Sequence, residues 1–151
     1  MNPRNRFDQL AARTTPTELG ELEMLFDGLA DVEEAFMVGD WDGGVFVTGH
    51  PGEAQLPAMQ WIGKSFRSRD DVDPIVSPGA DGARVANPIM GSASLRRVEY
   101  RGVVTATMVY DKHPIFDHFR RVDDDTVLGV MDRKKDPFPL FFWLRRCRPS
   151  A

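Results

Sequence analysis

"SLRRVEYRGVVTATMVYD", residues 94–111, carries the clearest secondary-structure pattern of the chain. Arg101 and Gly102 divide it into two runs. In the second run two sets of side chains alternate, with Val104, Ala106, Met108 and Tyr110 on one side and Val103, Thr105, Thr107 and Val109 on the other. This period of two is typical of a strand, and a glycine between two such runs favours a tight turn. The stretch therefore predicts an antiparallel hairpin whose turn lies near Gly102.

Strand-like segments continue on the C-terminal side of this hairpin. Residues 115–122 and 126–132 predict a second hairpin, with the three aspartates of 123–125 as its turn, because Asp bonds its own backbone in turns. Residues 139–147 predict a last strand. On it Phe142 and Leu144 share one face, and the other face carries Phe141, Trp143 and Arg145.

The segment before the first hairpin is less regular. Residues 44–49 and 59–68 are β-branched and aromatic, and Gly63 within the second predicts a bulge or bend. Residues 70–84 hold two prolines and two glycines, and they predict a loop with one short strand. With the later segments this gives about seven to nine strands, a number typical of a small antiparallel barrel.

The N-terminal residues predict helices. Thr15 is suited to cap a helix whose first turn contains Pro16 and Glu18, and the apolar residues that follow recur at helical spacing. Asp31 is suited to cap a second, short helix. We therefore expect one domain over residues 1–151, with a helical cap over 1–37 and a barrel over 38–148.

The composition limits the kinds of molecule and compartment expected for this protein. The 151 residues have a formal net charge of −4, which argues against nucleic acid as the main partner. One cysteine excludes an internal disulfide. The sequence has neither a secretion signal at residues 1–12 nor an apolar run long enough to span a membrane, so we expect a cytoplasmic protein. His113, Asp117 and His118 are close in sequence, but on a strand His118 faces away from the other two, so we expect no metal site.

Residues 110–125, YDKHPIFDHFRRVDDD, hold the densest group of ionisable side chains. Tyr110, Asp117 and His118 are the candidates for acid–base chemistry, since burial in a barrel would shift their pKa values. Strand parity places Tyr110, His118 and Arg120 on one face, and Asp111 and Asp117 on the other. Two alternatives stay open: an inward polar site built from His118, Arg120 and Tyr110, or a solvated outer face with weak ion pairs.

Many of the aromatic and methionine side chains would point into a barrel, where they either fill the core or line a cavity. Methionine linings adapt to varied apolar ligands. The predicted ligand-binding residues are Trp61, Lys64, Phe66, Met90, Met108, Tyr110, His118, Arg120, Met131 and Trp143.

Residues 39–43, GDWDG, fit the pattern G-x-W-x-G. Together with residues 63–66, 90–102, 106–132 and 141–146, they resemble the GXWXG-domain family, in which this region precedes a C-terminal domain of unknown function. At a greater distance the chain resembles the calycin superfamily of lipocalins, fatty-acid-binding proteins and nitrobindin-like barrels. The resemblance implies a mainly β, lipocalin-like barrel. In it Gly39, Trp41 and Gly43 are structural, and Arg145 or Arg146 packs over the Trp41 indole.

These observations predict a protein that binds a small apolar or amphipathic molecule inside the barrel. One alternative is a cofactor-independent lyase or isomerase, in which Tyr110, His118 and Asp117 or Asp111 move protons while Arg120 or Lys64 holds an anionic group. The other is a haem-binding barrel with His118 or His113 as axial ligand, as the nitrobindin resemblance implies. Apart from haem no cofactor is expected. A homodimer formed through an exposed barrel edge is the expected protein partner.

Overall fold

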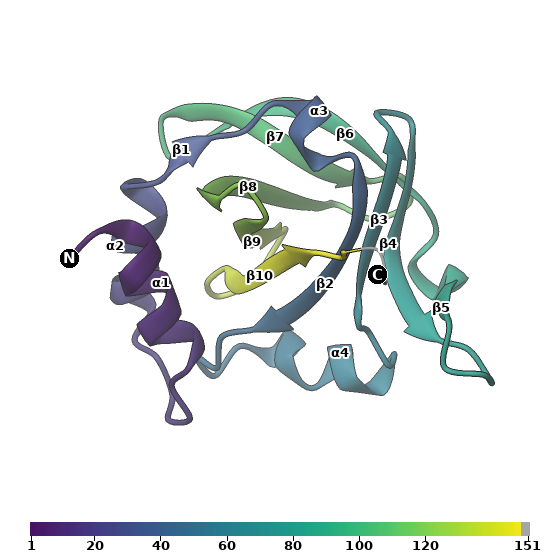
Figure 1. Cartoon of the computed structure of the whole chain (residues 1–151), viewed down its shortest axis with the longest axis horizontal. Coiled ribbons are helices and arrows are strands. Elements are labelled where there is room, and N and C mark those ends of the chain that lie inside the picture. Colours follow the sequence, from purple (N-terminus) through teal and green to yellow (C-terminus); the bar gives the residue numbers. More distant parts are fainter. Residues whose placement is uncertain (149–151) are drawn as a thin grey trace.

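The computed structural model describes residues 1–148, which form a closed antiparallel β-barrel of eight strands flanked by short helices (Figure 1). Around the barrel the strands follow the order β8-β7-β6-β4-β3-β2-β10-β9, and β9 pairs with β8 to close the ring. The barrel strands are β2 (Gly39–Val45), β3 (Gly63–Ser68), β4 (Asp71–Pro78), β6 (Ala93–Tyr100), β7 (Val103–Tyr110), β8 (Ile115–Asp123), β9 (Thr126–Arg133) and β10 (Leu140–Arg146). Two short strands, β1 (Ala30–Asp31) and β5 (Arg84–Ala86), pair with β8 and β4 outside this ring.

The two predicted hairpins are confirmed. In the first, β6 and β7 are paired along their whole length, from Ala93 opposite Tyr110 to Tyr100 opposite Val103. The turn residues Arg101 and Gly102 have φ values of 51° and 80°. Two successive positive φ values match the twist of the flanking strands, which is why a glycine occupies this turn. β8 and β9 likewise pair on either side of the acidic turn.

β4 corrects the expectation of a loop with one short strand over residues 70–84, because it is a barrel strand of eight residues. Pro74 lies where the register between β3 and β4 shifts, so its missing N–H interrupts no regular pairing. The same shift lies next to Gly63 and confirms the predicted bulge there. Val72, Ile75 and Val76 are buried, and this burial favours a strand despite the turn-forming residues around it.

The two predicted helices begin later than expected. α2 (Leu19–Asp27) has Glu18 as its N-cap, in a capping box with Glu21, and not Thr15. The Thr17 amide instead donates to the Val47 carbonyl at 2.8 Å, which holds the segment before α2 against the residues that follow β2. Asp31 lies in β1, and α3 (Glu34–Met37) is capped by Glu33. The remaining helices are α1 (Pro3–Ala11), α4 (Gln55–Ala58), and the 3₁₀ turns η1 (Pro51–Glu53) and η2 (Pro88–Met90).

Two hydrophobic cores follow from this arrangement. One fills part of the barrel interior, with Trp41, Phe66, Leu95, Phe119 and Phe142 among its buried residues. The other lies outside the barrel, where Phe7 and Leu10 of α1 and Leu22 and Phe26 of α2 cover side chains of β9 and β10 such as Val130 and Phe141. α1 and α2 therefore cover the side of the barrel, while α3 and α4 lie at opposite ends (Figure 1).

The G-x-W-x-G segment is β2, and its three fixed residues have separate roles. Trp41 is fully buried, donates from its indole N–H to the Met37 carbonyl at 2.8 Å, and lies 4.2 Å below the guanidinium of Arg146. Gly39 begins the strand at a φ of 136°. At Gly43 a Cβ would lie 2.3 Å from the Trp61 ring, so only glycine leaves room for that indole.

Trp41 and Arg146 thus make the contact expected at the closed end of the barrel. Arg145, the other arginine proposed for that contact, lies outside, with its guanidinium 5.1 Å from the Trp143 ring. Parity explains the difference, because Arg146 shares its strand face with the inward residues Phe142 and Leu144.

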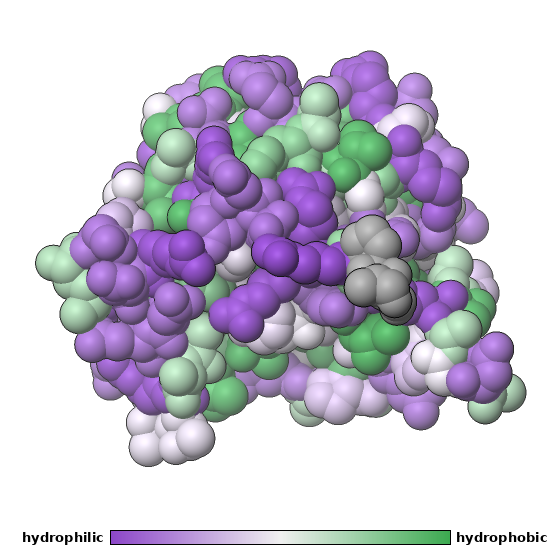
Figure 2. Space-filling model, viewed as in Figure 1, coloured by the Kyte–Doolittle hydropathy of each residue, from purple (hydrophilic) through white to green (hydrophobic). Residues whose placement is uncertain are grey.

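The surface seen in Figure 2 is mostly hydrophilic, with hydrophobic residues in separate patches. Among residues 1–148, none of the helices combines the length and the apolar character that a membrane span requires.

Candidate ligand-binding cavity

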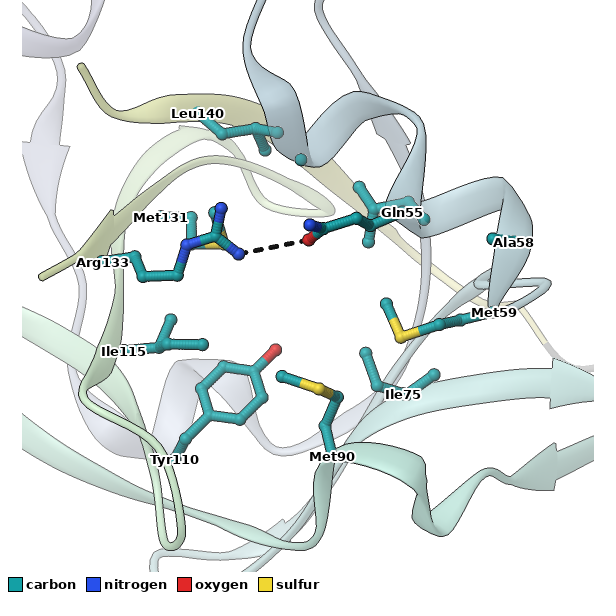
Figure 3. A pocket seen from close by; sticks show the side chains of 12 residues that line it. Gln55, Ala58, Met59, Ile75, Met90, Tyr110, Ile115, Met131, Arg133 and Leu140 are labelled. Carbon is teal, nitrogen blue, oxygen red and sulfur yellow. Dashed lines mark hydrogen bonds between the residues drawn. The ribbon is translucent and has the colours of Figure 1, made fainter. Parts of the chain in front are cut away.

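A cavity of about 310 Å³ opens at the end of the barrel covered by α4 (Figure 3). Its walls are mainly apolar, and its apolar side chains include Met59, Ile75, Met90, Ile115, Met131 and Leu140. They come from α4's C-terminal end, from η2 and from four strands, so the cavity exists only in the closed barrel. The Tyr110 hydroxyl points into it (Figure 3).

The mouth of the cavity carries a polar network. Arg133 of β9 donates to the Gln55 side chain of α4 at 3.2 Å (Figure 3) and to Asp136 at 3.0 Å. The other oxygen of the Asp136 carboxylate lies 3.0 Å from the His50 ring. These contacts tie α4 and its preceding turn to the barrel, and they place a cation at the entrance of an apolar space.

A smaller cavity of about 30 Å³ lies deeper and is bordered by Trp61, Lys64, Asp117 and Phe142. It shares Leu56, Tyr110, Met131 and Leu140 with the larger cavity, so the two adjoin. A volume of this size holds about one water molecule. This small cavity, the floor of the site, is mainly apolar, but it adds the charged side chains of Lys64 and Asp117 and has room for one small group.

Lys64 and Asp117 form an ion pair at this floor. The Lys64 ammonium lies 3.2 Å from Asp117 Oδ2 and donates to the Pro74 carbonyl at 3.1 Å, and the two side chains are 4% and 3% exposed. Three aromatic rings, those of Trp61, Tyr110 and Phe142, lie 5.5–5.7 Å from the same ammonium. β3 and β8 stand four strands apart in either direction around the ring, so the pair spans the barrel interior.

Burial sets the electrostatics of this floor. Desolvation raises the pKa of the Asp117 carboxyl, and the Lys64 charge opposes that shift. Desolvation also lowers the pKa of the Lys64 ammonium, against the attraction of Asp117. The pKa of Tyr110 lies well above its usual value, first because of burial and second because of the nearby Asp117 charge, so this side chain remains a phenol that can donate.

Two buried polar atoms of the floor lack a hydrogen-bond partner among residues 1–148. They are Asp117 Oδ1, an acceptor, and Trp61 Nε1, a donor. Leaving such groups unpaired costs about 1–3 kcal/mol each, more for a charged group. A bound molecule that offered a donor to Asp117 Oδ1 would remove part of this cost.

His118 and Arg120 occupy a different place from the one proposed, because they lie on the outer face of β8. The His118 ring stacks on Tyr100 at 4.0 Å and lies 3.0 Å from the Thr107 hydroxyl. Arg120 donates to the carbonyls of Phe26 and Leu29 at the end of α2. The inward site of His118, Arg120 and Tyr110 is therefore wrong, and Tyr110 instead shares the interior with Asp117.

The error has a structural cause. Residues 111–114 form a turn between β7 and β8, so strand parity cannot be counted from Tyr110 through to His118. Within β8 itself, Ile115, Asp117 and Phe119 face the interior, as an alternating strand requires. Asp111 is exposed at the start of this turn and accepts from Ser94 at 3.0 Å.

The other predicted residues divide into two groups. Trp61, Lys64, Met90, Tyr110 and Met131 border one of the two cavities. Phe66 and Met108 are buried in the inner core without lining a cavity, and Trp143 lies outside the barrel against Gly44. α4 is a helix of four residues and too short for a periodic pattern, so the sequence did not predict its contribution. The main cavity-lining residues that the sequence did not predict are Gln55, Leu56, Met59, Ile75, Ile115, Arg133 and Leu140.

Neither His113 nor His118 lines the cavity, so the described residues place no histidine where the haem hypothesis requires an axial ligand. His113 is exposed in the turn before β8. Within residues 1–148 there is likewise no group of three His, Cys, Asp or Glu side chains arranged to hold a metal ion.

Fold and site together define a small closed β-barrel with an internal apolar cavity. The family model described as "GXWXG protein" matches residues 24–82, and the one described as "Domain of unknown function (DUF4334)" matches residues 91–146. The chain belongs to the GXWXG family, with the domain of unknown function following the GXWXG region. The chain is similar to a protein from Thermomonospora curvata whose crystal structure is known. The two sequences are 42% identical, and the two structures superpose with a TM-score of 0.91 over 98% of this chain and 100% of that one. Comparison with curated proteins gives no match.

Proposed function

We propose that the protein binds a small, largely apolar molecule in the barrel cavity, with a polar group of that molecule at the floor. The observation that carries the proposal is an apolar space of about 310 Å³ that shares four lining residues with a small cavity bordered by the buried pair of Lys64 and Asp117. Ligand sites are typically apolar hollows with a few convergent polar groups, and this cavity has that composition.

The size and chemistry of the cavity restrict the ligand. The volume lies at the lower end of the usual range for ligand pockets, roughly 300–1,000 Å³. Met59, Met90 and Met131 supply flexible side chains that adapt to different apolar shapes. The unpaired Asp117 Oδ1 favours a ligand whose polar end carries a hydrogen-bond donor, and it disfavours a carboxylate at that position.

Titration with N-phenylnaphthylamine, an apolar fluorophore with one N–H donor, tests the proposal. The wild type is expected to bind it with a rise in fluorescence, and a cell lipid extract is expected to displace it. Met131→Trp fills the wall shared by both cavities and is expected to weaken binding at least tenfold. Met24→Trp, at a residue of α2 that is 78% exposed, is the matched control and is expected to bind normally.

Two results would overturn the proposal. One is a wild type that binds no fluorophore although its unfolding transition is cooperative. The other is equal binding by wild type and Met131→Trp, which would place the fluorophore outside the cavity.

A second candidate function is cofactor-independent proton transfer, of the kind used by isomerases and lyases. The observation that favours it is that Tyr110 and Asp117 border the same small cavity. There the Asp117 carboxylate would take a proton from the carbon next to a substrate carbonyl, and the Tyr110 phenol would donate a hydrogen bond to the carbonyl oxygen. Deuterium exchange into methyl nonyl ketone, followed by NMR in D₂O, tests this function. Exchange no faster than in buffer, or unchanged by Asp117→Asn, would remove it.

A further inference from the structure

Lys64 differs in its surroundings from every other lysine of the chain. The other three, Lys112, Lys134 and Lys135, are exposed. Lys64 is buried in the barrel interior, with its amino group at the border of the small cavity and next to Asp117. An amine in such a place is shielded from water and adjoins a space that admits an apolar molecule.

We propose that Lys64 forms a reversible imine with the carbonyl group of an apolar aldehyde or ketone bound in the cavity. The proposal rests on the proposed function, because the carbonyl compound must first bind there. It goes further by assigning a covalent step to one side chain and a functional group to the ligand.

The two adjoining cavities fit the two parts of such a ligand. The small cavity, of about 30 Å³, accommodates one small group beside the Lys64 nitrogen. The large cavity, with its apolar walls, accommodates the hydrocarbon part. Leu56, Tyr110, Met131 and Leu140 border both, so one molecule can occupy the two spaces at once.

Asp117 supplies the proton transfers that the reaction needs. At 3.2 Å it can accept a proton from the Lys64 ammonium, which frees the amine to attack. A C–N bond forms while the carbonyl π bond breaks, and the proton on Asp117 moves to the oxygen to give a carbinolamine. The C–O bond then breaks, and the oxygen leaves as water with a second proton from nitrogen relayed through Asp117. The products are a protonated imine beside an Asp117 carboxylate and one water molecule, so atoms and charge balance without a further reactant.

The surroundings of the pair suit both the reactants and the product. Burial lowers the pKa of Lys64 and raises that of Asp117, which reduces the cost of transferring the proton between them. The protonated imine is again a cation. The rings of Trp61, Tyr110 and Phe142, which lie 5.5–5.7 Å from the ammonium, would stabilise it as they do the ammonium.

Reductive trapping tests the inference. Wild-type protein is incubated at neutral pH with decanal and cyanoborohydride, which converts an imine to a stable secondary amine, and the modified residues are located by peptide mass spectrometry. Lys64 is expected to be modified at least ten times faster than Lys112, Lys134 or Lys135, which serve as internal controls in the same sample. Met131→Trp is expected to lose the modification of Lys64 and keep the slow modification of the exposed lysines.

Displacement of N-phenylnaphthylamine by decanal, measured in parallel, separates failure of the inference from failure of the proposed function. Displacement with Lys64 left unmodified would overturn the imine and keep the binding function. Absence of both displacement and Lys64 modification would also overturn the imine, whereas the binding function fails only if N-phenylnaphthylamine itself does not bind in the cavity. Modification of Lys64 at the same rate in wild type and Met131→Trp would also contradict the inference, because the aldehyde would then reach the amine without using the cavity.

Discussion

The Lys64 ammonium lies 3.2 Å from the Asp117 carboxylate, and the two residues belong to strands on opposite sides of the barrel. Removing two charges from water costs free energy that their attraction does not always restore, so stability alone is a weak reason for such a pair. The adjoining cavity gives a better reason, since both residues border it. We therefore interpret the pair as the polar end of a binding site.

Lys64→Met is expected to destabilise the fold by about 3 kcal/mol, because it leaves the buried Asp117 carboxyl without its counter-charge. Urea unfolding followed by far-UV circular dichroism measures the change. The control is the double variant Lys64→Met/Asp117→Leu, which replaces both charges with apolar groups and is expected to lie within about 1 kcal/mol of the wild type. A double variant less stable than the single one would show that the pair itself stabilises the barrel.

Gly43→Ala is expected to destabilise the protein by about 1–3 kcal/mol, since the new Cβ would lie 2.3 Å from the Trp61 ring and must displace it. Trp61 borders the cavity floor, so binding of N-phenylnaphthylamine is expected to weaken as well. Gly20→Ala is the matched control, because a Cβ at Gly20 meets no atom within 4 Å and alanine favours a helix. Equal stability of the two variants would contradict the role assigned to Gly43.

Arg146→Met is expected to cost about 2 kcal/mol. The change removes a cation 4.2 Å from the Trp41 ring and hydrogen bonds to the carbonyls of Phe36 and Val38 at 3.0 and 3.2 Å. Arg145→Met, which affects contacts of a half-exposed guanidinium with the Trp143 and Phe7 rings and a 4.0 Å ion pair, is expected to cost less than about 1 kcal/mol. Urea midpoints of the two variants compare them. A larger loss at Arg145 would mean that the barrel end is not closed by Trp41 and Arg146.

His118 is expected to make folding sensitive to acid. Its pKa is lowered mainly by burial, with Asp132 opposing the shift, so the unfolded chain binds a proton at a higher pH than the folded one does. The stabilising contribution of neutral His118 is therefore present above about pH 6.5 and is lost as the pH falls from there towards the folded-state pKa. The slope from one such group is at most about 1.4 kcal/mol per pH unit.

Unfolding free energies measured between pH 5 and pH 8 test this sensitivity. His118→Gln is expected to flatten the acid side of the curve. A curve for His118→Gln that is parallel to that of the wild type would contradict the account.

Local patterns predicted much of the fold. The hairpin of residues 94–111 and the two faces of the last strand follow from alternation and one glycine, both of which are encoded within a few residues. The site was predicted only in part: the lyase or isomerase alternative grouped Tyr110, Asp117 and Lys64, but strand parity put Tyr110 and Asp117 on opposite faces, and the ion pair of Lys64 with Asp117 was not predicted. That pair depends on barrel closure, which brings β3 opposite β8, and no local pattern encodes it. A turn also breaks the alternation of strand faces. Alternation counted from Tyr110 across residues 111–114 therefore assigned His118 to the wrong face of the barrel wall.

Native mass spectrometry tests the central claim, that the barrel cavity holds a small molecule, most directly. Wild type and Met131→Trp are incubated with the same cell lipid extract, desalted and measured without denaturation. The account predicts a small-molecule adduct on the wild type and none on Met131→Trp. An adduct equally abundant on both proteins, or on neither, would contradict it.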